Sequence, residues 1–347
     1  MKFNKQDIEQ ALKTITVPGE GQNMIESKAV KNIMVFADEV IVDITISNPS
    51  LQAKKRTEVD ILKTIHELVY AKAKIQVNVK VEASTQPKNE IKGKSIPGIQ
   101  NIVAVASGKG GVGKSTVTSN LAVTLSKMGF KVGILDADIY GPSIPIMFDV
   151  QNEKPLAVNV EGKSKMKPVE SYGVKNISMG LLIDEESPVV WRGPMIMKTI
   201  QQFAHNVVWG ELDYLLIDLP PGTGDAQLSL AQILPLDGVL IITTPQKAAV
   251  DVARRGARMF EKVNVPILGV IENMSFLQDE ETGKKNYLFG QGGGASTSQA
   301  LQCPFLGEIP LHEEVRLGGD HGTPVVITNP DNLSSKQING VAAKVVQ

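Results

Sequence analysis

The segment Gly108-Lys-Gly-Gly-Val-Gly-Lys-Ser115 decides the fold of this 347-residue chain. It fits the pattern G-x-x-x-x-G-K-[ST], in which glycines let the backbone wrap around phosphate oxygens and point successive N–H groups at them. In this pattern Lys114 would contact the β- and γ-phosphates, and the Ser115 hydroxyl would ligate Mg²⁺. Lys109 is a second lysine that an ordinary phosphate loop does not need. The segment therefore predicts a nucleotide site with one additional positively charged side chain, that of Lys109.

The flanks of this loop predict the strand–loop–helix arrangement of a phosphate site. Residues 102–106 are a short apolar run typical of a buried parallel strand. Apolar residues at helical spacing predict a helix over 115–127, with Gly129 as its stop. The dipole and free N–H groups at the start of such a helix favour bound phosphate. The predicted nucleotide-contacting residues of the loop are Gly108, Lys109, Gly110, Gly111, Val112, Gly113, Lys114, Ser115 and Thr116.

Composition and charge indicate a globular protein and give no sign of a nucleic-acid or membrane partner. A hydrophobic content of 42% is typical of a globular chain with a sizeable core. The formal net charge of −1 gives no general attraction to nucleic acid or to membranes, so neither is expected as a partner. The single cysteine, Cys303, cannot form an intramolecular disulfide, and the first residues lack the apolar core of a signal peptide. We therefore expect a cytoplasmic protein.

Periodicity divides the chain into a small N-terminal part and a larger second part. Residues 1–84 are expected to form a small α+β domain, because the alternating segments 40–46 and 75–81 predict strands. Residues 85–100 are polar and contain two prolines and two glycines, a composition typical of a linker. Residues 101–347 are predicted to form the nucleotide-binding domain.

The second part alternates near-continuous apolar strands with helices. Such strands, each followed by acidic or polar residues, indicate a mainly parallel sheet covered by helices on both faces. The strands predicted after the first are residues 132–135, 214–217, 239–243 and 267–271. The predicted fold class is therefore α/β, a P-loop NTPase preceded by the small α+β domain. Ligands of such sheets bind at the carboxyl ends of the strands.

Carboxylates follow two of these strands. Asp218 comes after four apolar or aromatic residues, the Walker-B pattern that holds Mg²⁺. Asp136 and Asp138 follow the strand at 132–135. We expect Asp136 to support the Mg²⁺ held by Ser115 and Asp218. Asp138 is the predicted catalytic residue that orients or activates a water, although a helix cap or turn is the alternative for either aspartate.

Two more polar segments follow predicted strands. Residues 220–225 read Pro-Pro-Gly-Thr-Gly-Asp, and a stiff glycine-containing loop near the γ-phosphate is typical of a switch element. Asn273 follows the strand at 267–271, and its amide has the donors and acceptors that suit the edge of adenine. A turn-forming asparagine is the alternative interpretation of Asn273.

With these motifs in order, the chain resembles a known family. The matching segments are the loop with Lys109 and residues 136–143, 191–195, 209–225 and 272–275. They resemble the Mrp/ApbC iron–sulfur cluster carriers, a branch of the MinD/ParA-like ATPases with a deviant Walker-A loop. The resemblance covers about residues 100–330, and residues 1–84 resemble, more weakly, the small domain that often precedes the ATPase in Mrp proteins.

The resemblance implies an ATP-hydrolysing homodimer with ATP sandwiched at its interface. In such dimers the extra lysine, here Lys109, reaches the phosphates bound by the partner subunit, so it joins Lys114 and Asp138 as a predicted catalytic residue. A positive charge supplied across an interface stabilises charge on the transferring phosphoryl group. The cofactors implied are ATP and Mg²⁺. The further partners implied are apo iron–sulfur client proteins or assembly factors.

The chain departs from that family in its cysteines. Typical members place Cys-x-x-Cys soon after the segment that corresponds to 272–275, and two such pairs would hold a four-iron cluster across the dimer. Here residues 276–287 contain no cysteine. Cys303 is the only thiol that could contribute to an iron–sulfur cluster, and a buried, inert cysteine is the alternative interpretation.

Three functions fit these observations. The first is an ATPase that binds or transfers iron–sulfur clusters through a cysteine-poor site. The second is a cluster-free, ATP-gated adaptor or maturation factor. The third is a MinD/ParA-like positioning ATPase, which is disfavoured because residues 334–347 lack the basic and bulky pattern of a membrane-targeting helix.

Overall fold

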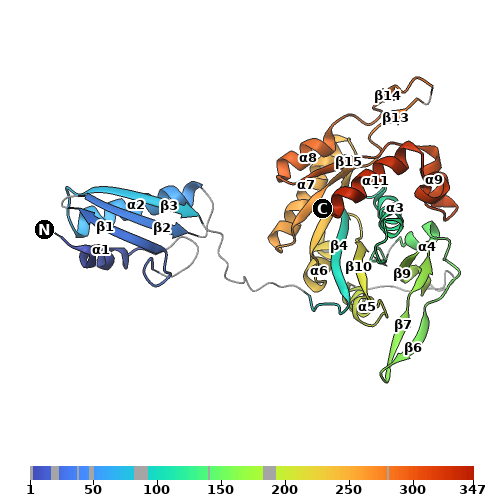
Figure 1. Cartoon of the computed structure of the whole chain (residues 1–347), viewed down its shortest axis with the longest axis horizontal. Coiled ribbons are helices and arrows are strands. Elements are labelled where there is room, and N and C mark those ends of the chain that lie inside the picture. Colours follow the sequence, from blue (N-terminus) through green and yellow to red (C-terminus); the bar gives the residue numbers. More distant parts are fainter. Residues whose placement is uncertain are drawn as a thin grey trace. The chain divides into compact units, whose positions relative to one another are not determined.

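The chain divides into two compact units in the computed structural model, residues 1–90 and 91–347 (Figure 1). The structure describes residues 3–16, 23–36, 39–46, 51–81, 93–139, 141–182, 193–279 and 281–347. The expected linker, residues 85–100, lies partly outside these ranges, and its last two residues already belong to the first strand of the second unit. We call the two units the N-terminal unit and, after the activity expected from its sequence, the ATPase unit.

The N-terminal unit packs two helices against a three-stranded sheet. Its elements are α1 (Lys5–Leu12), β1 (Val30–Phe36), β2 (Glu39–Ile46), α2 (Leu51–Leu68) and β3 (Lys74–Val81). Strand β2 lies in the middle, antiparallel to β1 and parallel to β3. Alternation along β2 buries Val40, Val42 and Ile44 against both helices, as the period-two pattern predicts. The strands predicted at 40–46 and 75–81 are present, whereas β1 was not predicted.

The ATPase unit is built on an eight-stranded sheet that is parallel except for one edge strand. In spatial order its strands are β15 (Phe305–Glu308), β12 (Ile267–Glu272), β11 (Gly238–Thr243), β4 (Ile99–Ser107), β10 (Leu212–Asp218), β5 (Val132–Asp136), β9 (Val174–Ser178) and β8 (Val169–Ser171). Only β8 runs antiparallel to its neighbour. Strand β4, which precedes the phosphate loop, lies between β10 and β11. The predicted α/β fold class is confirmed.

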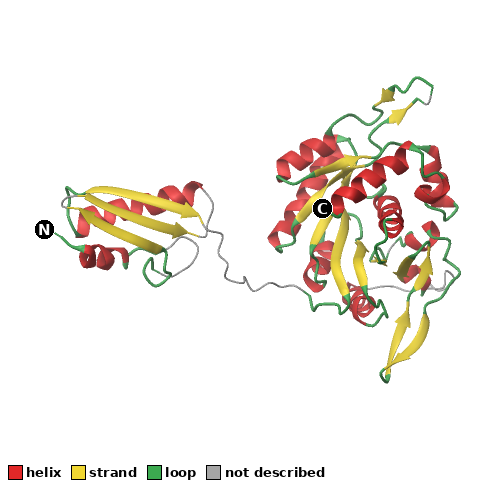
Figure 2. Cartoon of the chain, viewed as in Figure 1, coloured by secondary structure: helices red, strands yellow, loops and turns green. Residues whose placement is uncertain are grey.

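Helices cover both faces of this sheet (Figure 2). On one face lie α5 (Gly193–His205), α6 (Asp225–Ile233), α7 (Lys247–Lys262) and α8 (Gly293–Leu301). The other face is covered by α3 (Lys114–Lys127), α4 (Ile144–Met147), α10 (Val325–Thr328) and α11 (Leu333–Val345). Alternate residues of β4 enter the two cores: Ala104 and Ala106 face α7, and Val103 and Val105 face α3. Burial on both faces explains why these strands are apolar throughout.

Short elements lie around the sheet. They are the hairpin β6 (Leu156–Val160) and β7 (Lys163–Lys167), the 3-10 helix η1 (Met179–Leu181), the hairpin β13 (Leu277–Gln278) and β14 (Lys285–Asn286), and α9 (Glu313–Asp320). None of the helices in the described ranges is both long and apolar enough to cross a bilayer.

Candidate functional site

The phosphate loop joins the carboxyl end of β4 to the first turn of α3. Gly113, at the N-cap of α3, has a φ of 77°, in the left-handed region that favours glycine. A Cβ atom at Gly113 would also collide with the side-chain amide of Asn273. Helix α3 begins at Lys114, so the free N–H groups of its first turn point at the loop. The strand, the glycine loop and the helix start thus follow one another in the order that the glycine pattern predicts for an anion site.

Four side chains form a buried cluster beside this loop. Strand β10 is paired with β4, and its last residue, Asp218, is fully buried. The Lys114 ammonium lies 2.6 Å from Asp218 Oδ2, and Ser115 Oγ donates to the same oxygen at 2.6 Å. Thr118 Oγ1 donates to Asp218 Oδ1 at 2.8 Å. Two predicted site residues of the loop and the Walker-B aspartate are thus in direct contact, with both carboxylate oxygens occupied.

Asp136 adds a second buried carboxyl next to Asp218. The two aspartates end neighbouring strands and face each other in the register of β10 and β5. Asp136 accepts hydrogen bonds from the Asp138 N–H and from Ser178 Oγ, each at 3.0 Å. Burial, followed by the nearby charge of Asp218, raises the pKa of Asp136 to about 8, although Lys114 opposes the shift. Asp136 therefore binds its proton more tightly than an exposed aspartate does.

Asp138 and Lys109 lie on the open side of the site. Asp138 is half-buried and follows the end of β5, two residues after Asp136. Lys109 is exposed, and its side chain forms no ion pair or hydrogen bond with any residue in the described ranges. The structure thus brings Asp138 to the edge of the site, and it leaves the Lys109 ammonium on the outer surface of the loop.

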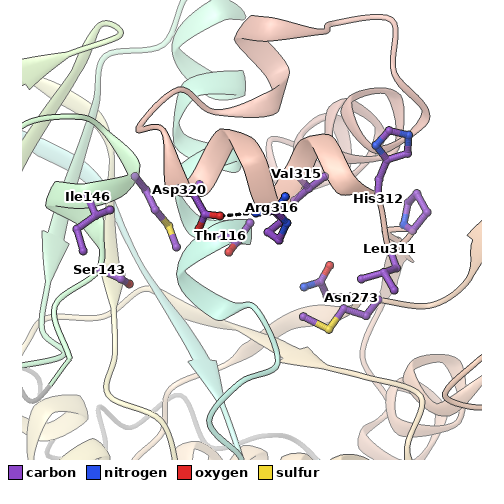
Figure 3. A pocket seen from close by; sticks show the side chains of 13 residues that line it. Thr116, Ser143, Ile146, Asn273, Leu311, His312, Val315, Arg316 and Asp320 are labelled. Carbon is purple, nitrogen blue, oxygen red and sulfur yellow. Dashed lines mark hydrogen bonds and ion pairs between the residues drawn. The ribbon is translucent and has the colours of Figure 1, made fainter.

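Asn273 lies in the wall of a pocket beside the phosphate loop. Its Nδ2 donates to the Val112 carbonyl at 2.9 Å, so the donor half of this amide supports the loop backbone. The pocket has a volume of about 370 Å³, within the range of small-molecule sites. Figure 3 shows Asn273, Leu311 and His312 along one side of it and Ile146 along the other. Asn273 Oδ1 remains as the acceptor of this amide for the adenine contact expected of it, and the pocket beside it has apolar side chains in its lining.

The segment 220–225, which we call the switch segment, is tied to the phosphate loop. Gly222 N–H donates to the Ser107 carbonyl at 3.0 Å, immediately before the loop. Gln227 is buried in α6, and its Nε2 donates to the carbonyls of Ser107 at 3.2 Å and Pro220 at 2.5 Å. One amide thus holds together the two segments that would contact phosphate.

The donors at this site fit Mg²⁺ bound with a nucleotide. Ser115, Asp218 and Asp136 offer hard oxygen ligands at one strand edge. No group of three or more His, Cys, Asp or Glu side chains suited to a metal occurs within the described ranges. One or two carboxylates are nevertheless enough for Mg²⁺, because phosphate oxygens and waters complete its octahedron.

Cys303 is not part of the buried side-chain cluster around Asp218. It lies between α8 and β15, before the start of a parallel strand, whereas the phosphate loop lies at the carboxyl ends of these strands. Its backbone N–H donates to the Ser298 carbonyl, and it is packed at the margin of the core. Burial raises the pKa of its thiol, so the thiolate form is disfavoured. The structure thus separates Cys303 from the other predicted site residues.

Sequence reasoning missed two residues that hold the acidic groups. Thr118 lies four residues after Lys114 and therefore on the same face of α3, a spacing that could have identified it. Ser178 ends β9, a strand with polar Lys175 and Asn176 that gave no clear strand pattern. The segment 191–195 includes residues outside the described ranges at 191 and 192.

The raised pKa of Asp136 makes stability depend on pH. Between about pH 4 and 8 the folded state retains a proton that the unfolded chain releases, so the free energy of unfolding falls as the pH rises. The difference in this free energy between wild type and Asp136→Asn should therefore decline across that window, by up to ~1.4 kcal/mol per pH unit.

Urea denaturation without nucleotide or metal, followed by tryptophan fluorescence, measures this difference. Both tryptophans, Trp191 and Trp209, belong to the ATPase unit, so the signal reports that unit alone. The exposed Asp251 gives a matched control, because Asp251→Asn should keep the wild-type pH dependence. Parallel pH profiles for wild type and Asp136→Asn would contradict the assignment.

Comparison with known proteins identifies related chains for both units. The profile of the family described as "NUBPL iron-transfer P-loop NTPase" matches residues 98–346, and that of "Iron-sulfur cluster assembly protein" matches residues 5–85. An iron-sulfur cluster carrier protein from Synechocystis sp. is 40% identical over 336 residues, which are 96% of this chain and 94% of the relative. The resemblance drawn from the motifs is therefore confirmed.

Solved structures agree with this relationship. A nucleotide-binding protein from Archaeoglobus fulgidus in complex with ADP is 40% identical, with a TM-score of 0.58 over 65% of this chain and 87% of that protein. The cell division ATPase MinD from Pyrococcus furiosus, 22% identical with a TM-score of 0.53 over 71% of this chain and 98% of its own, shares the fold. The chain is a member of the NUBPL iron-transfer P-loop NTPase family, with a nucleotide-binding P-loop at the carboxyl edge of its sheet.

Proposed function

We propose that this protein binds and hydrolyses ATP as a homodimer and that it transfers iron–sulfur clusters to apoproteins. The observation that carries the proposal is the buried contact of Lys114 and Ser115 with Asp218, in a chain whose relatives are named as cluster carriers. A buried ion pair at the end of a phosphate loop brings the lysine, the hydroxyl and the carboxylate to one point. The reducing cytosol stays the predicted compartment, because one cysteine cannot form an intramolecular disulfide.

The loop and the first turn of α3 would hold the triphosphate. Loop N–H groups from Gly108 to Thr116 would contact phosphate oxygens, and Lys114 would exchange its contact with Asp218 for the β- and γ-phosphates. Mg²⁺ held by Ser115 and Asp218, with Asp136 in support, would neutralise charge that develops on the phosphates. The base would occupy the 370 Å³ pocket, with Asn273 Oδ1 as an acceptor for the adenine amino group.

Asp138 and Lys109 would complete the hydrolytic site. The half-buried carboxylate of Asp138 can accept a proton from a water directed at the γ-phosphate. Lys109 carries an exposed ammonium that would contact phosphate oxygens in the partner subunit. The hydrogen-bond partners of Asp218 are Lys114, Ser115 and Thr118, so the Lys109 ammonium is not engaged in that internal cluster.

Asp138→Asn tests the catalytic role. The amide cannot accept the water proton, so turnover should fall by about 10²- to 10⁴-fold while the affinity for ATP changes little. Steady-state ATP hydrolysis and equilibrium binding of a fluorescent ATP analogue measure the two effects. As a control, Asp331→Asn alters an exposed carboxylate in the turn before α11 and should keep near wild-type turnover. Wild-type turnover in Asp138→Asn would reject this role.

Mixing two inactive variants tests the cross-subunit role of Lys109. Lys109→Ala and Asp138→Asn should each be nearly inactive as homodimers. A mixed dimer has one site with an intact Asp138 and a Lys109 from the other subunit, so an equimolar mixture should regain about one quarter of the wild-type activity. If Lys109 acted within its own subunit, both sites of the mixed dimer would lack one group, and no activity would return.

The iron–sulfur cluster would be the cargo of this protein. A four-thiolate cluster shared by two subunits needs two cysteines from each, and this chain has only Cys303. Any cysteine-ligated iron therefore depends on that residue, together with ligands other than thiolates of this chain. ATP binding would change the dimer and so favour uptake or release of the cargo.

Anaerobic reconstitution tests the cargo. We expect iron and acid-labile sulfide to co-elute with the wild-type protein, and the iron content to fall in Cys303→Ser because no other thiol is present. Iron and sulfide analysis after gel filtration measures both. Unchanged iron in Cys303→Ser would show ligation by other groups, and wild-type protein without iron would contradict cargo binding.

One observation favours a second candidate function, the cluster-free, ATP-gated adaptor. Strands β13 and β14 pair antiparallel within the range 276–287, which contains no cysteine. Asp279 Oδ1 accepts hydrogen bonds from the Thr282 N–H at 2.7 Å and from Thr282 Oγ1 at 2.6 Å. The hairpin thus offers no thiolate to a cluster, which favours a chain that binds client proteins instead of clusters.

A further inference from the structure

A groove lies between α6 and α7, beside the switch segment. Its volume is about 490 Å³, and it belongs to the sheet face opposite the phosphate-loop helix α3. Half-buried Leu228, Met259 and Val263 give it an apolar lining. Thr223 and Gly224 of the switch segment also line it. The groove is thus separate from the pocket assigned to the base, but it reaches a segment next to the nucleotide phosphates.

One wall of this groove is positively charged. Arg255, Arg258 and Lys262 line it from α7, and all three are exposed. Their spacing of i, i+3 and i+7 places them in a line about 10 Å long on one face of the helix. Asp225 is the single acidic residue among the lining residues. We call this feature the basic groove.

Within the part of the chain that the structure describes, no acidic side chain pairs with Arg255, Arg258 or Lys262. None of them forms an ion pair there, and the one hydrogen bond is from Arg255 Nε to the carbonyl of Asp251, in the preceding turn of α7. By contrast, the neighbouring Arg254 turns away and donates to Ser296 Oγ at 2.6 Å. Unpaired cations along an apolar groove favour an occupant that has carboxylates on one side and apolar groups on the other.

We propose that the basic groove docks an acidic amphipathic helix of the protein that receives the cargo, and that its occupation is coupled to the nucleotide site. The identity of the partner as a recipient rests on the proposed function, whereas the docking itself does not. Carboxylates of the helix would contact Arg255, Arg258 and Lys262, and its apolar face would cover Met259. The lining residues include no aromatic ring on which a base could stack, so a protein segment fits better than single-stranded nucleic acid.

Contacts of α7 supply the coupling to the nucleotide. A Cβ atom at Gly256, in the middle of α7, would lie 3.3 Å from Thr223 Cγ2 and 4.0 Å from the Cα of Gly108. A Cβ atom at Gly108 would in turn collide with the backbone of Val252 and Ala253. The helix that carries the cations is therefore packed directly against the first glycine of the phosphate loop and against the switch segment. A shift of either segment must change the groove.

A designed peptide tests the docking. The probe is a fluorescein-labelled helix of about 12 residues, with glutamates at i, i+3 and i+7 and leucines on the opposite face. Fluorescence anisotropy with the full-length protein should show binding that weakens as salt is added. Arg255→Glu/Arg258→Glu/Lys262→Glu should lower the affinity at least about tenfold, and so should replacement of the peptide glutamates by glutamine.

A matched variant separates the groove from general charge. Lys163→Glu/Lys284→Glu/Lys336→Glu reverses three exposed lysines elsewhere in the ATPase unit, so it changes the net charge by the same amount. This control should bind the peptide like the wild type. Equal loss of affinity in both triple variants, no peptide binding by the wild type, or tighter binding of a single-stranded oligonucleotide at the same residues would each overturn the proposal.

Reciprocal titrations test the coupling. If peptide changes the affinity for ATP by some factor, ATP must change the affinity for peptide by the same factor, and we expect at least about fivefold. Equal peptide affinity with and without ATP would also overturn the proposal. ATP binding and basal hydrolysis should persist in the groove variant, so a failure of docking is distinguishable from a failure of the ATPase. Neither titration uses an iron–sulfur cluster, so both remain decisive whatever iron content the reconstituted protein has.

Discussion

The ion pair between Lys114 and Asp218 joins the phosphate loop to the neighbouring strand, and much of the site depends on it. Both groups are buried, so loss of either partner would leave an unpaired charge in the core, at a cost of about 3–5 kcal/mol. Thr118 and Ser115 satisfy the remaining acceptor capacity of Asp218. The same ammonium is the group expected to bind phosphate. Ligand binding must therefore replace this contact with one of similar strength.

The order of strands explains why these groups meet. Strand β4 lies between β10 and β11, and β5 lies next to β10, so the residues that follow these strands gather at one edge of the sheet. Two buried aspartates meet there beside one lysine, and burial, followed by the charge of Asp218, raises the pKa of Asp136. On the opposite face, α7 packs against the same loop and carries cations toward a separate groove. The nucleotide site and the basic groove thus share the first glycine of the loop as a common support.

Features encoded by local pattern could be predicted from the sequence. The phosphate loop is contiguous, and Asp218 and Asp136 follow strands whose apolar runs are plain. Features that depend on distant contacts could not be predicted in the same way. Ser178 supports Asp136 from a strand with buried polar Asn176, and the donor amide of Asn273 is engaged by the Val112 carbonyl. The position of Cys303, away from the other site residues, depends on the strand order rather than on spacing.

The central place of β4 also has a consequence during synthesis of the chain. Its partners are made much later: Asn101 bonds across to the carbonyl of Asp213, which lies 112 residues further along. A ribosome-bound chain that ends before β11 contains the whole phosphate loop but lacks a neighbour of the strand that carries it. Such long-range pairing slows folding and leaves apolar strands exposed to chaperones. The strand that carries the phosphate loop thus has both of its neighbours only after translation has passed β11, at residue 243.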